Sequence, residues 1–150
     1  MKSVIFDIDG TLSDGRAFDF LLDQKPKLWD EWNRQTFHHV PWAPIVSQYF
    51  SHHFQGHDNY IITARAENCR LYTENWLHKH ALARGHKGLY MRAAGDHRPD
   101  FIIKEEIIHF LKKNYGLSFD IAYDDRPQVI EMYKRNGIDA RLVANGIILE

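Results

Sequence analysis

The sequence predicts an α/β fold: a parallel five-stranded sheet of Rossmann-like type with helices on both faces. Short β-favouring apolar runs alternate along the chain with segments of helical periodicity, an order typical of parallel sheets. Three of the apolar runs end in acidic or hydroxyl side chains. The chain has 150 residues, of which 44% are apolar and 26% charged, and we expect one domain over residues 1–150.

The five expected strands are apolar runs with β-branched and aromatic residues. The first, Val4–Phe6, begins almost at the N-terminus and leads directly into Asp7. The others are expected at 60–63, 88–91, 119–123 and 138–143. A helical segment separates most neighbouring strands, so each is expected to join the sheet in parallel through a right-handed crossover.

The helical segments show apolar residues three and four positions apart, often with proline at the start and glycine at the end. They are expected shortly after Pro26 and at 44–56, 66–83, 99–116 and 127–137. The pattern does not place the tryptophan-rich stretch 13–43 relative to the sheet.

The composition limits where in the cell the protein is expected to work. Cys69 is the one cysteine, so no disulfide forms within the chain, and a reducing, cytoplasmic location is expected. Asp7 comes too early for a signal peptide, and no apolar run is long enough to span a membrane, so we expect no membrane contact.

The formal net charge is −1, which disfavours binding of nucleic acid by bulk attraction. The stretch 78–98 is locally basic, with Asp96 as its one acidic residue. Its cationic residues are Lys79, Arg84, Lys87, Arg92 and Arg98. Composition alone favours a solvated surface here, and nucleic-acid contact is the alternative.

Polar side chains cluster at three strand ends. Asp7 and Asp9 follow the first strand, Thr63 and Arg65 the second, and Asp124-Asp125 the fourth. The carboxyl ends of parallel strands share one edge of the sheet, so four carboxylates are expected to converge there. Their repulsion requires a positive charge between them, and Mg2+ prefers such oxygen ligands.

Each residue taken alone has a simpler interpretation. Asp124-Asp125 stands just before Pro127 and is typical of a helix cap, and Thr63 is also a candidate cap. The occurrence of all three groups at one edge of the predicted sheet favours a functional site.

Asp7-x-Asp9-Gly10-Thr11 resembles the first motif of the haloacid-dehalogenase-like (HAD) phosphohydrolases. Thr63, Lys104 and Asp124-Asp125 stand where the second, third and fourth motifs of that superfamily would be. Nearly the whole chain is similar to the 3′-phosphatase domain of bacteriophage polynucleotide kinase–phosphatases. That narrower likeness also includes Arg16, Thr63-x-Arg65, Gly95-Asp96-x-Arg98-x-Asp100, Lys104-Glu105-Glu106-Ile107 and Asp124-Asp125-Arg126-x-Gln128-Val129-x-Glu131-Met132. Thr63 departs from the serine that is frequent in the family but keeps the hydroxyl.

The resemblance implies roles for the four carboxylates. Asp7 is the expected nucleophile, which forms an aspartyl-phosphate. Asp9 is the expected acid for the leaving oxygen and later the base for water, with a pKa raised by neighbouring carboxylates. Mg2+ would be held by Asp7, the backbone carbonyl of Asp9 and the Asp124-Asp125 pair, with Asp125 favoured as the direct ligand.

The remaining roles concern substrate. Thr63 is expected to donate its hydroxyl to a phosphate oxygen, and Lys104 to offset negative charge near Asp7. Asp100 is expected to orient Lys104 from one helical turn away. Arg16 and Arg65 are expected to grip phosphate, because a guanidinium matches its geometry.

The function expected from this resemblance is a Mg2+-dependent phosphomonoesterase, a polynucleotide 3′-phosphatase of nucleic-acid end repair. The motif spacing leaves no room for a full cap domain, so we expect a site open to a phosphorylated nucleic-acid 3′ end. Tryptophans of the stretch 13–43 are candidates for stacking on bases or for the core. No Gly-x-x-x-x-Gly-Lys-Ser/Thr motif is present, so a kinase or ligase partner would be a separate unit.

Two alternatives remain open. One is a small-molecule phosphatase such as a 5′-nucleotidase. The other is a non-catalytic module that binds phosphate or a partner.

Overall fold

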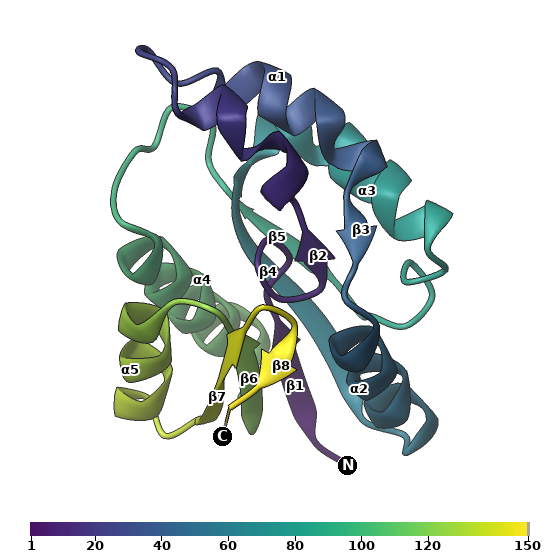
Figure 1. Ribbon diagram of the computed structural model, residues 1–150. Coiled ribbons are helices and arrows are strands. Elements are labelled where there is room, and N and C mark those ends of the chain that lie inside the picture. Colours follow the sequence, from purple (N-terminus) through teal and green to yellow (C-terminus); the bar gives the residue numbers. More distant parts are fainter. Residues whose placement is uncertain (150) are drawn as a thin grey trace.

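A computed structural model describes residues 1–149 and shows a six-stranded sheet with the order β5-β4-β1-β6-β7-β8 (Figure 1). The strands are β1 (Ser3–Phe6), β4 (Asp58–Ala66), β5 (Leu89–Arg92), β6 (Ile121–Asp124), β7 (Asp139–Ala144) and β8 (Ile147–Ile148). The first five are parallel, as predicted, and β8 is antiparallel to β7. The predicted number of five strands is therefore wrong by one.

The sixth strand arises from a tight turn. Asn145 and Gly146 both have positive φ, at 49° and 76°, which is the geometry that joins two antiparallel strands through two residues. Asn-Gly is the strongest short hairpin signal in a sequence, but β8 is only two residues long and gives little periodicity of its own.

Helices occupy the expected segments with some shifts, and two short 3-10 helices, η1 and η2, were not expected. They are η1 (Arg16–Leu22), α1 (Trp29–Arg34), η2 (Gln35–His38), α2 (Ala43–Phe54), η3 (Glu67–Cys69), α3 (Arg70–Lys79), α4 (Asp100–Tyr115) and α5 (Pro127–Arg135). The helix predicted from residue 66 begins at Arg70, because β4 runs on to Ala66 through a register shift after Ile62. Within residues 1–149, no helix has both the length and the apolar character needed to cross a membrane.

Alternate residues of the central strands enter two separate cores. Val4 and Phe6 lie with residues of α2 and α3, whereas Ile5 lies with residues of α4 and α5. Figure 1 shows the corresponding layers, with α4 and α5 on one side of the sheet and α2 on the other. Both faces of β1 are buried, so its register against β4 and β6 is strongly specified.

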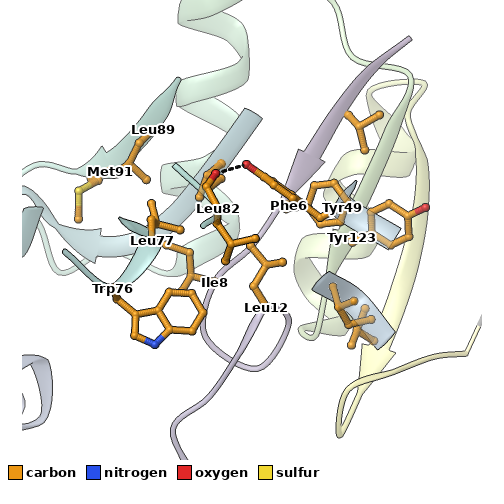
Figure 2. Close-up of a cluster of buried hydrophobic side chains, with 14 of the residues drawn as sticks. Phe6, Ile8, Leu12, Tyr49, Trp76, Leu77, Leu82, Leu89, Met91 and Tyr123 are labelled. Atoms are coloured by element: carbon orange, nitrogen blue, oxygen red, sulfur yellow. Dashed lines mark hydrogen bonds between the residues drawn. The ribbon is translucent and has the colours of Figure 1, made fainter. Parts of the chain in front are cut away.

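Aromatic rings fill the core on the α2 and α3 side (Figure 2). Phe6 stacks on Tyr123 with ring centroids 4.8 Å apart and meets Tyr49 edge-on at 5.2 Å. The Tyr49 hydroxyl donates to the Leu82 carbonyl at 2.6 Å. These contacts join β1, β6 and α2 directly beneath the segment that carries Asp7.

The stretch 13–43 forms a small layer beyond the strand ends. It contains η1, α1, η2 and a two-stranded ribbon of β2 (Ser13–Asp14) and β3 (Val40–Pro41). Two hydrogen bonds attach it to α3: Trp76 Nε1 donates to the His39 carbonyl at 2.9 Å, and Lys79 Nζ donates to the Phe37 carbonyl at 3.0 Å. Figure 1 shows α1 lying across the same end of the molecule.

Replacing Trp76 by alanine should destabilise the fold strongly, because its side chain is fully buried and also holds the insert. Loss of a buried tryptophan costs about 3–5 kcal/mol, read as the free energy of unfolding in urea. Trp29 is 49% exposed, and Trp29→Ala is the matched control, with an expected cost of about 1 kcal/mol or less. Equal costs for the two variants would contradict this packing.

Candidate active site

A cleft of about 1000 Å³ lies at the carboxyl ends of β1, β4 and β6. All nine residues predicted for the site line this cleft: Asp7, Asp9, Arg16, Thr63, Arg65, Asp100, Lys104, Asp124 and Asp125. The strand order brings them together, because β1 pairs with both β4 and β6.

Lys104 lies at the floor of the cleft between two carboxylates. Its Nζ donates to Asp7 Oδ1 at 3.0 Å and to Asp124 Oδ2 at 2.6 Å. All three residues are at most 5% exposed. Burial lowers the pKa of Lys104, but attraction to Asp124 and Asp7 outweighs it, so the pKa is raised and the ammonium ion persists.

Lys104 does not compensate the whole negative charge. Burial, followed by repulsion from Asp124, raises the pKa of Asp7 well above its ordinary value. Burial and repulsion from Asp124 also raise the pKa of Asp125 to about 6. A further positive charge would favour the ionised form of Asp7, which the expected nucleophilic role requires.

Asp7, Asp124 and Asp125 form an acidic cluster suited to a divalent cation. Each offers a carboxylate oxygen, and the three oxygens lie within 4.8 Å of one another. Nine carboxylates and six Lys or Arg side chains line the cleft, which leaves a formal surplus of three negative charges. A hard cation with oxygen ligands fits both observations.

Gly10 keeps room for this cluster. Its φ of +82° is a conformation that glycine adopts without strain, and a Cβ there would collide with the carboxylate of Asp125. Asp124 has both carboxylate oxygens in hydrogen bonds, one to Lys104 and one accepting from the Arg126 backbone N–H.

Asp9 turns away from the other carboxylates toward Arg65. Arg65 donates from Nε to Asp9 Oδ2 at 2.8 Å and from Nη2 to Asp9 Oδ1 at 2.5 Å. Burial raises the pKa of Asp9, but the charge and hydrogen bonds of Arg65 outweigh it, so the pKa is lowered. The raised pKa predicted from crowding is therefore wrong, because the nearest charge is a guanidinium.

Two threonines lie at the same strand ends, and one of them contacts Asp7. Thr63 is 1% exposed, and its Oγ1 accepts from the Arg65 backbone N–H at 3.2 Å. Thr11 Oγ1 donates to Asp7 Oδ2 at 3.2 Å, a contact that was not predicted from the sequence. The signal was present, since Thr11 ends the Asp7-x-Asp9-Gly10-Thr11 motif.

Asp100 does not contact Lys104. It accepts from Arg92 Nη2 at 2.7 Å and pairs with Arg126 Nε at 3.1 Å. The predicted orienting role is therefore wrong: Lys104 points into the buried carboxylates, and Asp100 faces the strand β5 and the loop after β6. Arg92, whose Nε also donates to the Ala64 carbonyl at 2.8 Å, joins these segments.

Arg16 lies at the cleft margin with 61% of its side chain exposed. It donates to Asp14 from Nε at 2.9 Å and from Nη2 at 2.8 Å, and its guanidinium lies 5.1 Å from the centre of the Trp42 ring. Its contact with substrate phosphate stays a prediction.

The basic stretch is divided between two parts of the molecule. Arg92 and Arg98 line the cleft, and both are paired with carboxylates. Lys79, Arg84 and Lys87 are not among the lining residues, and the Lys87 backbone N–H bonds to Asn59 near the amino end of β4. The stretch is therefore not one continuous surface beside the cleft, because it runs from the end of α3 through β5 to the loop before α4.

The insert 13–43 forms one wall of the cleft, a position that the sequence did not reveal. Trp29, Trp32 and Asn33 of α1 line it, together with Trp42. Trp32 is 6% exposed, whereas Trp29 presents half of its surface.

Comparison with known proteins agrees with this geometry. The family model of the polynucleotide kinase PNKP phosphatase domain matches residues 1–147. The chain belongs to this family. It is a HAD phosphatase, and this class hydrolyses phosphoric monoesters.

Solved structures of related folds support the assignment. A chain in the structure of the Pnkp1/Rnl/Hen1 RNA repair complex is 28% identical with a TM-score of 0.75, covering 96% of this chain and 43% of that one. A chain of a Pnkp1/Rnl/Hen1 complex is 29% identical with a TM-score of 0.75, covering 97% of this chain and 47% of that one. This chain thus spans less than half the length of these two. A hydrolase from Streptococcus pneumoniae TIGR4 shares the fold, with 20% identity and a TM-score of 0.67 over 96% of this chain and 94% of that one.

Replacing Gly10 by alanine should weaken binding of a divalent ion, because the added methyl group displaces Asp125. We expect affinity for Mg2+, measured by calorimetry, to fall by about 10-fold or more. Gly56→Ala is the matched control: its φ is also +82°, but nothing lies within 4 Å of its Cβ. The positive φ costs both variants about 1–2 kcal/mol of stability, so the control accounts for that backbone effect. Equal Mg2+ affinities would argue against a cation at this cluster.

Proposed function

We propose that this chain is a Mg2+-dependent polynucleotide 3′-phosphatase that acts through an aspartyl-phosphate intermediate. The observation that supports it most is the buried set Asp7–Lys104–Asp124 with Asp125 at the floor of the cleft. A phosphate monoester needs a placed nucleophile and neutralised charge, and this set offers both.

Asp7 is the nucleophile of the proposal. Lys104 and Thr11 each hold one of its carboxylate oxygens, which orients the group for attack on phosphorus. Mg2+, held by Asp7 and Asp125 with Asp124 beside them, would supply positive charge to the phosphoryl oxygens. The Thr63 hydroxyl is placed at the same edge and would donate to a phosphate oxygen.

Asp9 would serve both halves of the reaction. Arg65 holds it as a carboxylate, the form that takes a proton from water when the aspartyl-phosphate is hydrolysed. In the first half it must carry a proton for the leaving oxygen. The dianionic phosphate of the substrate favours that protonated form, since like charges disfavour ionisation.

A nucleic-acid end as substrate is supported by the size of the cleft and by Trp29. An exposed tryptophan in the cleft wall offers a stacking surface for a base. The likeness to chains from an RNA repair complex also supports an end-repair role beside a separate kinase or ligase.

One observation favours the alternative of a small-molecule phosphatase such as a 5′-nucleotidase. Arg16, Arg92, Arg98 and Arg126 at the cleft are all paired with carboxylates of the protein. A polymer brings further phosphates, and these arginines would have to exchange partners to bind them.

Replacing Asp7 by asparagine should abolish turnover, because the amide has nearly the same size but is not a nucleophile. We expect the hydrolysis rate of an aryl phosphate to fall by at least about 10³-fold. Asp23→Asn, an exposed carboxylate that does not line the cleft, is the control and should keep the wild-type rate. A wild-type rate for Asp7→Asn would refute the covalent mechanism.

Substrate class is tested by comparing kcat/KM for a 3′-phosphorylated oligonucleotide and a 3′-mononucleotide. We expect the oligonucleotide to be preferred. Trp29→Ala should reduce its kcat/KM by about 10-fold, since stacking on one base contributes about 1–3 kcal/mol. Charge reversal at Lys87, which does not line the cleft, should leave kcat/KM unchanged for both substrates. Equal turnover of both substrates would favour the nucleotidase alternative.

A further inference from the structure

Arg65 stands behind Asp9, as seen from the cleft. The Arg65 side chain is 3% exposed and that of Asp9 is 33% exposed. The Asp9 carboxylate is therefore accessible from the cleft, whereas the Arg65 guanidinium that binds it is buried in the protein.

The other edge of the guanidinium is held by two threonines. Arg65 Nη1 donates to Thr36 Oγ1 at 3.2 Å and to Thr73 Oγ1 at 3.1 Å. Nε and Nη2 donate to the carboxylate of Asp9. The hydrogen-bond partners of Arg65 therefore lie on two different edges of its planar guanidinium. The guanidinium carbon lies over the Trp32 ring, 5.7 Å from the ring centre.

Both hydroxyls are themselves fixed. Thr36 Oγ1 donates to the Asn33 carbonyl at 2.6 Å, and Thr73 Oγ1 donates to the Cys69 carbonyl at 3.0 Å. Each hydroxyl has used its one proton and turns a lone pair toward Arg65. Both residues are fully buried, so water does not compete for these bonds.

The two threonines come from different elements. Thr36 belongs to η2 of the insert, and Thr73 belongs to α3 beside the sheet. Arg65 reaches both only when the insert is docked on α3, which the bonds from Trp76 and Lys79 secure.

We propose that Thr36 and Thr73 are positioning residues that clamp the Arg65 guanidinium and thereby orient the carboxyl group of Asp9. The inference rests on the proposed acid–base role of Asp9. It makes the insert 13–43 part of the acid–base machinery as well as a wall of the cleft.

The clamp would restrict the motion of the Arg65–Asp9 pair. Arginine has a long, flexible side chain, and two bonds to a single carboxylate leave the pair free to swing together. Fixing Nη1 removes that freedom, and proton transfer depends strongly on the position of the donating group.

The test replaces each threonine by valine, singly and together, because valine keeps the shape and removes the hydroxyl. The first readout is the exchange rate of the Arg65 Nε–H with solvent, followed by nitrogen-15 NMR. We expect it to rise at least about 5-fold in the double variant, because one side of the guanidinium loses its acceptors. Thr→Ser variants, which keep the hydroxyl, should restore slow exchange.

The second readout is sensitivity to the leaving group. A good aryl leaving group needs little protonation, whereas an alkyl oxygen needs an acid. In the double valine variant kcat for an alkyl phosphate should fall by about 10-fold, and kcat for an aryl phosphate by about 2-fold or less. Asp9→Asn is the reference and should show the same bias in stronger form.

Tyr49→Phe is the control for general loss of a buried hydroxyl. Tyr49 is also fully buried and donates to the Leu82 carbonyl, but it does not contact Arg65. It should destabilise the fold while leaving both readouts at wild-type values.

Unchanged Nε–H exchange in the double valine variant would overturn the clamp. Faster exchange with equal losses on both phosphates would overturn its transmission to Asp9. Neither readout involves a nucleic acid, so a failed oligonucleotide preference leaves this test intact. An unbiased Asp9→Asn would count against the proposed acid role of Asp9, separately from the NMR result.

Discussion

The buried ion set of Asp7, Lys104 and Asp124 is the constraint on which the rest of the site depends. A lysine that is 1% exposed is costly to desolvate, and only its two carboxylate partners compensate that cost. The carboxylates depend on it in turn, since burial and mutual repulsion disfavour their charged forms. The three side chains come from the end of β1, from α4 and from β6, so the charge balance also fixes how these elements meet.

The topology explains why this set forms beside β1. After β1 the chain crosses to β4 on one side, and it returns later to β6 on the other side. The crossovers therefore leave β1 in opposite directions, and a crevice opens at its carboxyl end. Aromatic packing of Phe6 on Tyr123 holds β1 and β6 together one residue before Asp7 and Asp124.

The insert 13–43 contributes mainly to the site rather than to the main cores. It contributes little to the two main cores, but its Thr36 and Trp32 contact Arg65, and its Trp29 borders the cleft. Two kinds of contact thus meet at the cleft wall: buried polar bonds that place an arginine, and an exposed aromatic ring that faces the substrate side. In the related chains of the two Pnkp1/Rnl/Hen1 complexes, more than half of the chain lies outside the matched region. The family match over residues 1–147 includes the insert and the cleft described here.

The sequence by itself determined the alternation of strands and helices, the five parallel strands and nine of the residues that line the cleft. Local signals carry most of this information: apolar runs of period two or 3.6, proline and glycine at helix ends, and acidic residues directly after buried strands. Arg16, Asp100 and Lys104 were predicted from the resemblance to a known family instead. The turn residues Asn145-Gly146 also indicate a hairpin that leads into β8, although a strand of two residues is too short to show periodicity.

Only the tertiary structure decided how the polar side chains pair. Sequence proximity suggested that Asp100 orients Lys104 and that carboxylates crowd Asp9, but Asp100 binds Arg92 and Asp9 binds Arg65. The sequence also did not predict the position of the insert or the separation in space of Lys87 from Arg98. The physical reason is that the direction of a charged side chain depends on the nearest opposite charge in space, and that partner lies up to 97 residues away along the chain, as Lys104 does from Asp7.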